Sequence, residues 1–147
     1  MIDIQIKSFE ELTKQELYYL LQLRSEVFVV EQDCVYQDID EKDQKAIHIL
    51  GFKNNTLIAY SRIFKPGDYF TQASIGRVVV SKKERSFKYG YDIMKASIKA
   101  IKNHYNQTHI KISAQCYLKQ FYNNLGFKAI GSPYLEDNIP HIAMIRE

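Results

Sequence analysis

The chain has 147 residues, of which 46% are hydrophobic and 25% charged, and its formal net charge is +3. Such a length suits one domain of about 100 to 150 residues, and the composition is unlike that of a disordered or fibrous chain. The small net charge argues against binding nucleic acid mainly through its phosphates, and no apolar run approaches the ~20 residues that span a bilayer. We therefore predict a single domain over residues 1–147, in the cytoplasm, with no nucleic-acid or membrane partner.

The chain opens with patterns typical of a strand and a helix. Isoleucine alternates with polar residues over residues 2–6, which predicts a half-buried strand. Thr13 and Glu16 have the spacing of a capping box, and apolar residues recur at helical intervals after them, so we predict a helix over residues 14–28. Residues 31–43 are rich in acidic side chains without apolar periodicity, and we interpret them as a long loop.

The next segments predict a hairpin and a central strand. Residues 46–52 and 56–64 are rich in β-forming side chains and are joined through Lys53-Asn54-Asn55, whose asparagines tolerate positive φ, so they should pair as an antiparallel hairpin. Pro66-Gly67-Asp68 ends this pattern. The apolar run over residues 74–80 is then typical of a central strand.

The remaining chain predicts a helix over residues 89–104, a strand over 109–114, a helix over 117–125 that ends at Gly126, and closing strands over 127–130 and 141–146. A strand, a helix and a strand in succession usually form a right-handed parallel crossover, so strands 74–80 and 109–114 should be neighbours. The predicted fold class is α/β, of the α+β kind with one mixed sheet flanked by helices.

The turn over residues 81–88 is the first candidate for chemistry. It follows a strand that should be parallel to its neighbour and precedes a helix N-terminus, a position that favours anions. Lys82, Lys83, Arg85 and Lys88 add positive charge there. A solvated basic loop explains the same residues equally well, and a small RNA-binding surface with aromatic stacking groups is a further alternative. Cys34 and Cys116 lack the paired spacing of zinc or redox motifs, so we predict free thiols and no metal.

The segment Arg85-Ser86-Phe87-Lys88-Tyr89-Gly90 resembles the pyrophosphate loop of the GNAT superfamily of acetyl-CoA-dependent N-acetyltransferases, whose pattern is Gln/Arg-x-x-Gly-x-Gly/Ala. Arg85 and Gly90 match this pattern, and Lys88 stands where the family usually has glycine. Other segments resemble the ElaA-like branch of that superfamily in the right order: Leu23-Arg24, Glu31-Gln32, Ile75-Gly76-Arg77-Val78-Val79-Val80, Ser113-Ala114-Gln115, Phe121-Tyr122, Gly126-Phe127, and Pro140-His141-Ile142 with Met144.

The resemblance implies a GNAT-like acyl-CoA N-acyltransferase fold, in which strands 74–80 and 109–114 diverge and the pantetheine arm of acetyl-CoA enters the gap. Tyr122 stands where many members carry a tyrosine that protonates the departing thiolate. The implied activity is transfer of an acetyl group from acetyl-CoA to a primary amine by direct attack on the thioester. The residues implied in binding acetyl-CoA are Val78, Val79, Val80, Arg85, Ser86, Phe87, Lys88, Tyr89, Gly90, Gln115 and Tyr122.

The acceptor amine is mostly protonated at neutral pH and must lose a proton before it attacks, so a base or a water relay is needed. Glu31 and His141 lie in family-like segments and are the candidates for this role and for contact with the acceptor. His48 is ranked behind them, and Arg77 is expected to orient a carboxylate or to pair with an acidic loop residue. The acidic loop suggests a cationic small-molecule or peptide amine. The alternative function is a catalytically weak CoA-binding sensor of the same fold. A homodimer is the oligomeric state left open.

Overall fold

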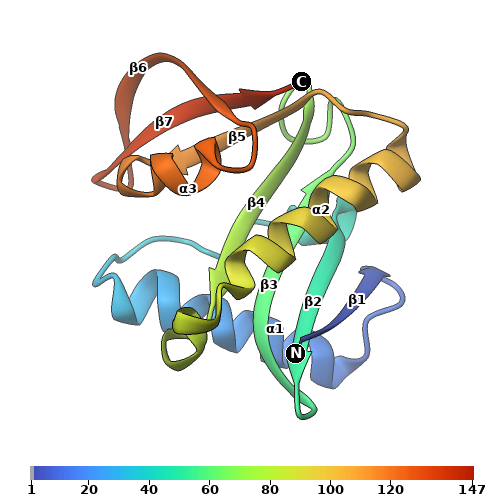
Figure 1. Ribbon diagram of the computed structural model, residues 1–147. Helices are drawn as coiled ribbons and strands as arrows, with labels where there is room; N and C mark the ends of the chain where they lie inside the picture. The colour runs from blue at the N-terminus through green and yellow to red at the C-terminus, as the bar shows by residue number, and fades with distance from the viewer. Residues whose placement is uncertain (1) are drawn as a thin grey trace.

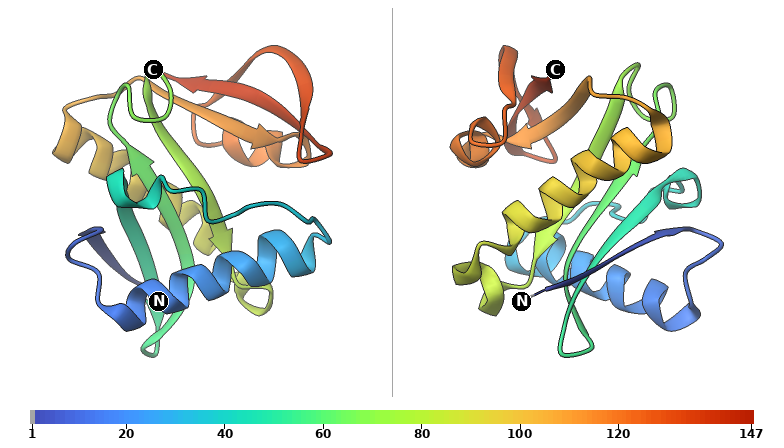
Figure 2. Two further views of the ribbon diagram at one scale, coloured as in Figure 1. Left: turned by 180° about the vertical axis from the view of Figure 1, so that it is seen from behind. Right: turned by 45° about the vertical axis from the view of Figure 1, so that its right-hand side comes forward.

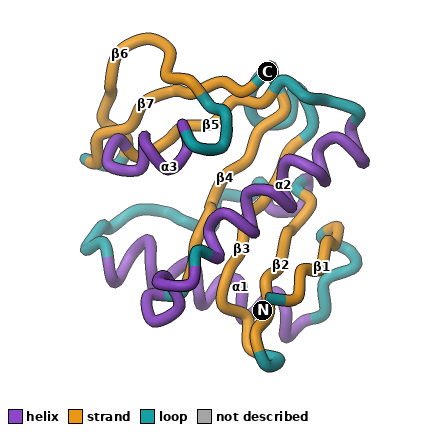
Figure 3. Tube along the Cα trace, in the orientation of Figure 1, coloured by secondary structure: helices purple, strands orange, loops and turns teal. Residues whose placement is uncertain are grey.

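The computed structural model describes residues 2–147, which form a seven-stranded sheet in the order β1-β2-β3-β4-β5-β7-β6 (Figures 1 and 3). Only the β4–β5 pair is parallel among the strand pairs of these residues, so the predicted mixed sheet and the predicted neighbours are confirmed. The strands are β1 (Asp3–Ser8), β2 (Ile47–Lys53), β3 (Thr56–Phe64), β4 (Ala73–Val80), β5 (Ile110–Gln115), β6 (Lys128–Glu136) and β7 (Ile139–Arg146).

Helix α1 (Lys14–Arg24) covers one face of the sheet, on the side seen in the left view of Figure 2. The predicted capping box is present, since Thr13 and Glu16 exchange side-chain and backbone hydrogen bonds at its start. Buried Leu20 and Leu23 pack against the sheet in a small apolar cluster. After Arg24 the chain continues as a π-helix, η1 (Ser25–Glu31), three residues beyond the predicted helix end. This wider helix carries Glu31 to the edge of the central cleft.

Helix α2 (Tyr89–Tyr105) crosses the opposite face of the sheet (Figure 1). Its buried residues Ile93, Met94 and Ile101 belong to the larger apolar cluster, which joins β2, β3, β4, β5 and β7. Each such side chain contributes about 1.5–3 kcal/mol when fully buried. The predicted boundaries of this helix are confirmed to within a residue. None of the helices formed by residues 2–147 has the length and apolar character needed to cross a bilayer.

Strands β4 and β5 pair only at their first residues, Ala73 with Ile110 and Ser74 with Lys111. The cause lies partly in a bulge on β4, because Tyr60 faces Val79 whereas Arg62 faces Gly76, which leaves one extra residue on β4. Arg77 lies in this bulge with φ of 53°. A bulge bends its strand and increases the local twist. The predicted divergence of the two strands is therefore confirmed.

The C-terminal hairpin is longer than the sequence predicted. β6 and β7 are joined by Asp137 and Asn138, whose φ values of 51° and 64° are those of a two-residue hairpin turn. Both strands therefore extend into residues 131–140, which the prediction left as a loop. Where one helix over residues 117–125 was predicted, the structure has two short segments, η4 (Cys116–Leu118) and α3 (Lys119–Asn123). The turn that follows α3 does end at Gly126, whose φ of 92° is left-handed as predicted.

Candidate functional site

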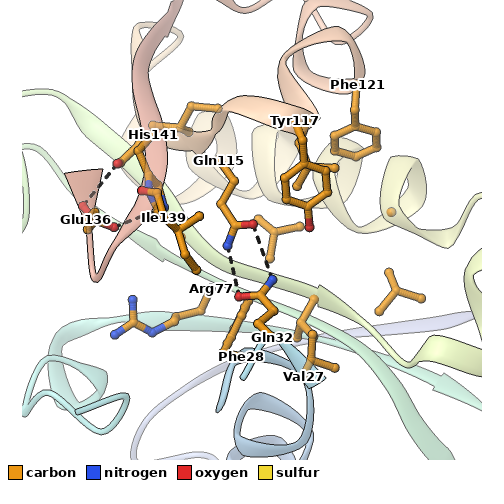
Figure 4. A pocket seen from close by; sticks show the side chains of 18 of the residues that line it. Val27, Phe28, Gln32, Arg77, Gln115, Tyr117, Phe121, Glu136, Ile139 and His141 are labelled. Atoms are coloured by element: carbon orange, nitrogen blue, oxygen red, sulfur yellow. Dashed lines mark hydrogen bonds and ion pairs between the residues drawn. The ribbon is translucent and has the colours of Figure 1, made fainter. Parts of the chain in front are cut away.

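A cavity of about 660 Å³ lies where β4 and β5 diverge (Figure 4). Its walls come from both strands, from the ends of η1 and β7, and from the first turns of α2 and α3. The predicted residues that line it are Glu31, Arg77, Val78, Val79, Val80, Arg85, Lys88, Gly90, Gln115, Tyr122 and His141. Four predicted residues do not line it: His48, Ser86, Phe87 and Tyr89. The structure thus gathers nearly all of the predicted site in one place.

The strand edge inside the cavity is suited to an extended ligand. Beyond Ser74, β4 has no strand partner on the β5 side within the residues described, although Val78, Val79 and Val80 line the cavity there. Main-chain groups at such an edge are ready to pair with another extended chain. A pantetheine arm carries two amide groups in an extended chain, so this edge fits the donor that the sequence implies.

The predicted pyrophosphate loop forms a 3-10 helix, η3 (Lys82–Phe87), followed by Lys88 and then by α2. Lys88 has φ of 61° and ψ of 28°, the left-handed conformation that glycine adopts at low cost. The ammonium of Lys53 on β2 fixes the loop, since it lies 2.8 Å from Glu84 Oε1 and 4.2 Å from the centroid of the Phe87 ring. The Phe87 side chain therefore supports the loop from outside the cavity.

Gly90, in the first turn of α2, allows a close approach between two helices. A Cβ at this position would lie 3.3 Å from two ring atoms of Phe121 on α3. The Phe121 ring in turn packs against Tyr91, with centroids 4.7 Å apart. The absence of a side chain at Gly90 thus lets Phe121 pack directly against the first turn of α2.

Arg85 and Glu31 form a two-pronged ion pair at the same end of the cavity. Arg85 Nη1 lies 2.5 Å from Glu31 Oε2, and Nη2 lies 2.7 Å from Oε1. Arg85 Nε also donates to the carbonyl oxygen of Val80 at 3.1 Å. Hydrogen bonding from Arg85 lowers the pKa of Glu31. A carboxylate that is bound at both oxygens and held ionised is a weak proton acceptor, so this geometry disfavours Glu31 as the base.

Tyr122 lies on α3 and is buried at the cavity wall with 7% of its surface exposed. Its ring packs edge-on against Phe121 and Phe127, with centroids 5.0 and 6.1 Å away. Burial raises the pKa of Tyr122 above its ordinary value of 10.0. The phenol therefore keeps its proton at neutral pH, which is the state that a proton donor to a leaving group requires.

Gln32 and Gln115 bridge the cavity between the end of η1 and the end of β5 (Figure 4). Gln115 Nε2 donates to Gln32 Oε1 at 3.3 Å, and Gln32 Nε2 donates to Gln115 Oε1 at 3.4 Å. Figure 4 shows Tyr117 and Phe121 on one side of this bridge and Glu136, Ile139 and His141 on the other. Because Phe121 contacts the start of α2, the first side is the one next to the pyrophosphate loop.

His141 lies on the far side of the bridge, on β7, and is 6% exposed. Its Nδ1 lies 2.7 Å from the carbonyl oxygen of Ile139, which accepts a hydrogen bond and so places the proton of the neutral ring on Nδ1. Nε2 then carries a lone pair. Glu136 Oε2 lies 3.5 Å from Nε2. His141 therefore presents a proton acceptor to the cavity.

Three aspartates of the acidic loop, Asp38, Asp40 and Asp43, are neutralised by arginines. Arg24 contacts Asp38 and Asp43 at 2.9 and 2.8 Å, and Arg62 contacts Asp43 at 2.9 Å. Arg62 also contacts Asp40 at 2.6 Å, which lowers the pKa of Asp40 despite its burial. The three aspartates thus hold the loop on the sheet, and this loop no longer supports the expectation of a cationic acceptor.

Arg77 completes this network. Its Nε lies 2.8 Å from Asp38 Oδ1, close enough for an ion pair although the angle is not that of a hydrogen bond, and its Nη2 lies 3.4 Å from Asp40 Oδ2. The predicted pairing of Arg77 with the acidic loop is therefore confirmed.

His48 lies in the interior next to the same network. It is fully buried, accepts a hydrogen bond from Tyr60 at 2.6 Å and donates to the carbonyl oxygen of Asp43 at 2.9 Å. The prediction that His48 faces the cleft is wrong. Burial lowers the pKa of His48, so the ring is neutral and acts as part of the core.

Sequence reasoning did not assign roles to several residues that line the cavity. Gln32 lies in a family-like segment that carries no predicted role for it, and Glu136 lies between the two predicted closing strands, where the sequence pattern predicts no element. The signal that would have found Glu136 is the Asp137-Asn138 pair, which has the residue types of a two-residue hairpin turn. The cavity residues without a predicted role include Gln32, Tyr36, Ser113, Tyr117, Phe121, Glu136, Asp137 and Ile139.

Comparisons with known proteins agree with this geometry. Residues 9–147 match the family model described as the acetyltransferase (GNAT) domain. The chain is 44% identical to protein ElaA of Escherichia coli strain K12, over 100% of this chain and 97% of the relative. The crystal structure of Escherichia coli ElaA matches with a TM-score of 0.93 at 44% identity, and that of an acyl-CoA N-acyltransferase from Pseudomonas aeruginosa with 0.94 at 40% identity. Both structural matches cover 100% of each chain.

Proposed function

This chain belongs to the GNAT acetyltransferase family and has the acyl-CoA N-acyltransferase fold, and from that premise we propose that it transfers the acetyl group of acetyl-CoA directly to a primary amine. The observation that carries the proposal is the gap between β4 and β5, a cavity lined by Gly90 at the start of α2, by Tyr122 and by His141, whose Nε2 is free to accept a proton.

The donor half of the cavity fits acetyl-CoA in its charge and shape. Arg85, Lys88 and the first amides of α2 supply positive charge and hydrogen-bond donors for the diphosphate. The free edge of β4 near Val78 and Val80 supplies main-chain partners for the pantetheine amides. In this proposal an amide of the same edge also stabilises the negative charge that develops on the thioester oxygen during transfer.

The proposed reaction removes two protons from the acceptor nitrogen and replaces the carbon–sulfur bond of the thioester by a carbon–nitrogen bond. The acceptor ammonium gives a proton to Nε2 of His141, and the freed amine attacks the thioester carbon, forming a carbon–nitrogen bond. As the carbon–sulfur bond breaks, Tyr122 gives its hydroxyl proton to the sulfur and regains one from the nitrogen of the new amide. The products are an acetylated amine and CoA, and His141 returns its proton to solvent.

Lys88 bears on the alternative of a catalytically weak CoA sensor. That alternative arose because lysine replaces the usual loop glycine, which put the close approach of the backbone to a phosphate in doubt. Lys88 nevertheless adopts the left-handed conformation of a glycine, so the loop keeps its course into α2. The retained backbone, together with the protonated Tyr122, supports an active enzyme rather than a sensor.

The test is the Tyr122→Phe variant, assayed by release of the CoA thiol with a panel of primary amines. We expect kcat to fall by about 100-fold or more, in the range that general acid catalysis contributes, while acetyl-CoA binding measured by calorimetry stays within about twofold. Tyr105→Phe is the matched control, because Tyr105 is a half-buried phenol at the end of α2 that does not line the cavity. An unchanged kcat in Tyr122→Phe would remove this residue from the mechanism.

A further inference from the structure

The acceptor side of the cavity carries negative charge that no basic side chain balances. Glu136 and Asp137 line it at the tip of the β6–β7 hairpin, and within residues 2–147 no lysine or arginine lies within ion-pair distance of either carboxylate. Arg77 lies on the same side, but Asp38 and Asp40 already engage it. In the network that joins Arg24, Arg62 and Arg77 to Asp38, Asp40 and Asp43, the charges of the three arginines and the three aspartates cancel. The net negative charge on the acceptor side of the cavity therefore comes from the hairpin.

Glu136 is held next to the open nitrogen of His141. Ser113 donates a hydrogen bond to Glu136 Oε1 at 3.3 Å, and the other oxygen, Oε2, lies 3.5 Å from His141 Nε2. The Tyr134 ring stacks on His141 with centroids 6.2 Å apart and fixes the plane of the imidazole. A carboxylate and a proton acceptor thus point to one spot in the cavity (Figure 4). His141 is more than nine-tenths buried, and its Nε2 has no hydrogen-bond partner among the described residues.

This arrangement matches the needs of a protonated amine. An ammonium group at that spot is attracted by Glu136 while it is charged and loses its proton to the adjacent Nε2 when it reacts. Asp137 follows Glu136 directly in the chain and also lines the cavity, so it adds a second negative charge at the tip of the hairpin. A carboxylate on the acceptor would instead face two like charges and find Arg77 already occupied.

We infer that the acceptor is an alkyl amine that carries a second positive charge and has no carboxylate near its reacting nitrogen, with Glu136 receiving the reacting ammonium and Asp137 the second charge. The inference rests on the proposed acetyl transfer and names its substrate class. It depends on the hairpin carboxylates and not on the acidic loop of residues 31–43, where arginines neutralise Asp38, Asp40 and Asp43.

The experiment compares three amines with the same straight chain and the same reacting group: diaminobutane, butylamine and aminobutanoate, whose far ends are an ammonium, a methyl group and a carboxylate. At low salt we expect kcat/KM to fall in that order, by about tenfold or more between the first and the last, because the far charge interacts with hairpin carboxylates in a partly enclosed cavity. Titration calorimetry on the protein saturated with CoA measures the same preference without turnover.

Two variants assign the two charges. Glu136→Gln should raise KM for all three amines by about tenfold, with a smaller effect on kcat, because it removes the partner of the reacting ammonium. Asp137→Asn should reduce the differences in kcat/KM among the three amines, because it removes the carboxylate that interacts with the group at the far end of each amine. Glu10→Gln is the control for net charge alone, since Glu10 is exposed and does not line the cavity. Thermal melts of each variant confirm that it is folded.

The outcomes separate this inference from the proposed function. Thiol release that is fastest with aminobutanoate, or a KM unaffected by Glu136→Gln, would overturn the inference while leaving acetyl transfer in place. Calorimetric preference for diaminobutane without thiol release from any amine would support the charge assignment and contradict acetyl transfer. Equal binding of all three amines to the wild type, whatever the turnover, would also overturn the inference.

Discussion

Replacing Lys88 by glycine should stabilise the protein, because its backbone lies in the left-handed region with φ of 61° and ψ of 28°. An L-residue other than glycine pays roughly 1–2 kcal/mol for this conformation. Glycine avoids that cost but loses about 0.5–1 kcal/mol more conformational entropy on folding. The net gain is therefore about 0.5–1 kcal/mol, which corresponds to a rise in Tm of roughly 2–3 °C for a chain of this size.

The comparison that isolates the backbone is Lys88→Gly against Lys88→Ala. Both variants remove an exposed ammonium, and only glycine relieves the left-handed conformation. Differential scanning calorimetry should give a higher Tm for Lys88→Gly than for Lys88→Ala, and both should bind CoA more weakly than the wild type by a similar factor if the ammonium contacts a phosphate. Equal melting temperatures for the two variants would refute the reasoning, because the strain would then not exist in solution.

Two further predictions concern charged groups. Glu31→Gln frees Arg85 from its ion pair, so the affinity for CoA measured by calorimetry should rise by about twofold to fivefold, as expected for a largely exposed pair. The affinity for pantetheine, which lacks the diphosphate, should stay constant. Weaker binding of CoA to the variant would contradict this prediction. Asp43→Asn should lower the free energy of unfolding by about 3–5 kcal/mol, because it removes one partner of a buried ion pair. The pKa of Asp43 is lowered in the folded state, so its stabilisation is complete above its ordinary value of 3.8 and is lost as the pH falls below it. Urea titrations from about pH 7 to pH 3 should therefore show a smaller acid-induced loss in Asp43→Asn than in the wild type, and parallel losses would argue against this role.

The order and type of most elements could be predicted because each has a strong local signal. The capping box at Thr13 and the Asn54-Asn55 turn both have the predicted geometry. Local signals do not encode the π-helical turns that extend the first helix to Glu31, since the widening depends on what surrounds the helix end. Local signals also failed to predict that β6 continues through Gly131-Ser132-Pro133. This segment would break a central strand, but it is tolerated in β6 because β6 is an exposed edge strand with an irregular register.

The cavity-lining residues of β4 could be predicted from the sequence, whereas most partners of the charged and imidazole side chains could not. The residues of β4 and of the pyrophosphate loop followed from the order of elements and the family resemblance. The partners of Glu31 and His48 did not, because each partner lies on another element of the fold, 54 positions away for Glu31 and 5 or 12 positions away for His48. Only the folded structure shows which carboxylates of this chain are neutralised by arginines and which remain free to contact a ligand.

The short contact between β4 and β5 divides the sheet into a four-stranded ribbon, β1 to β4, and a three-stranded ribbon, β5, β7 and β6, which share a seam of two residue pairs. Side-chain packing beneath α2 and α3 holds the two ribbons in place, and few hydrogen bonds oppose a change in the angle between them. A molecule inserted along the open edge takes the position of a missing strand. Such a molecule would add main-chain hydrogen bonds to a junction that otherwise depends on two residue pairs and on side-chain packing.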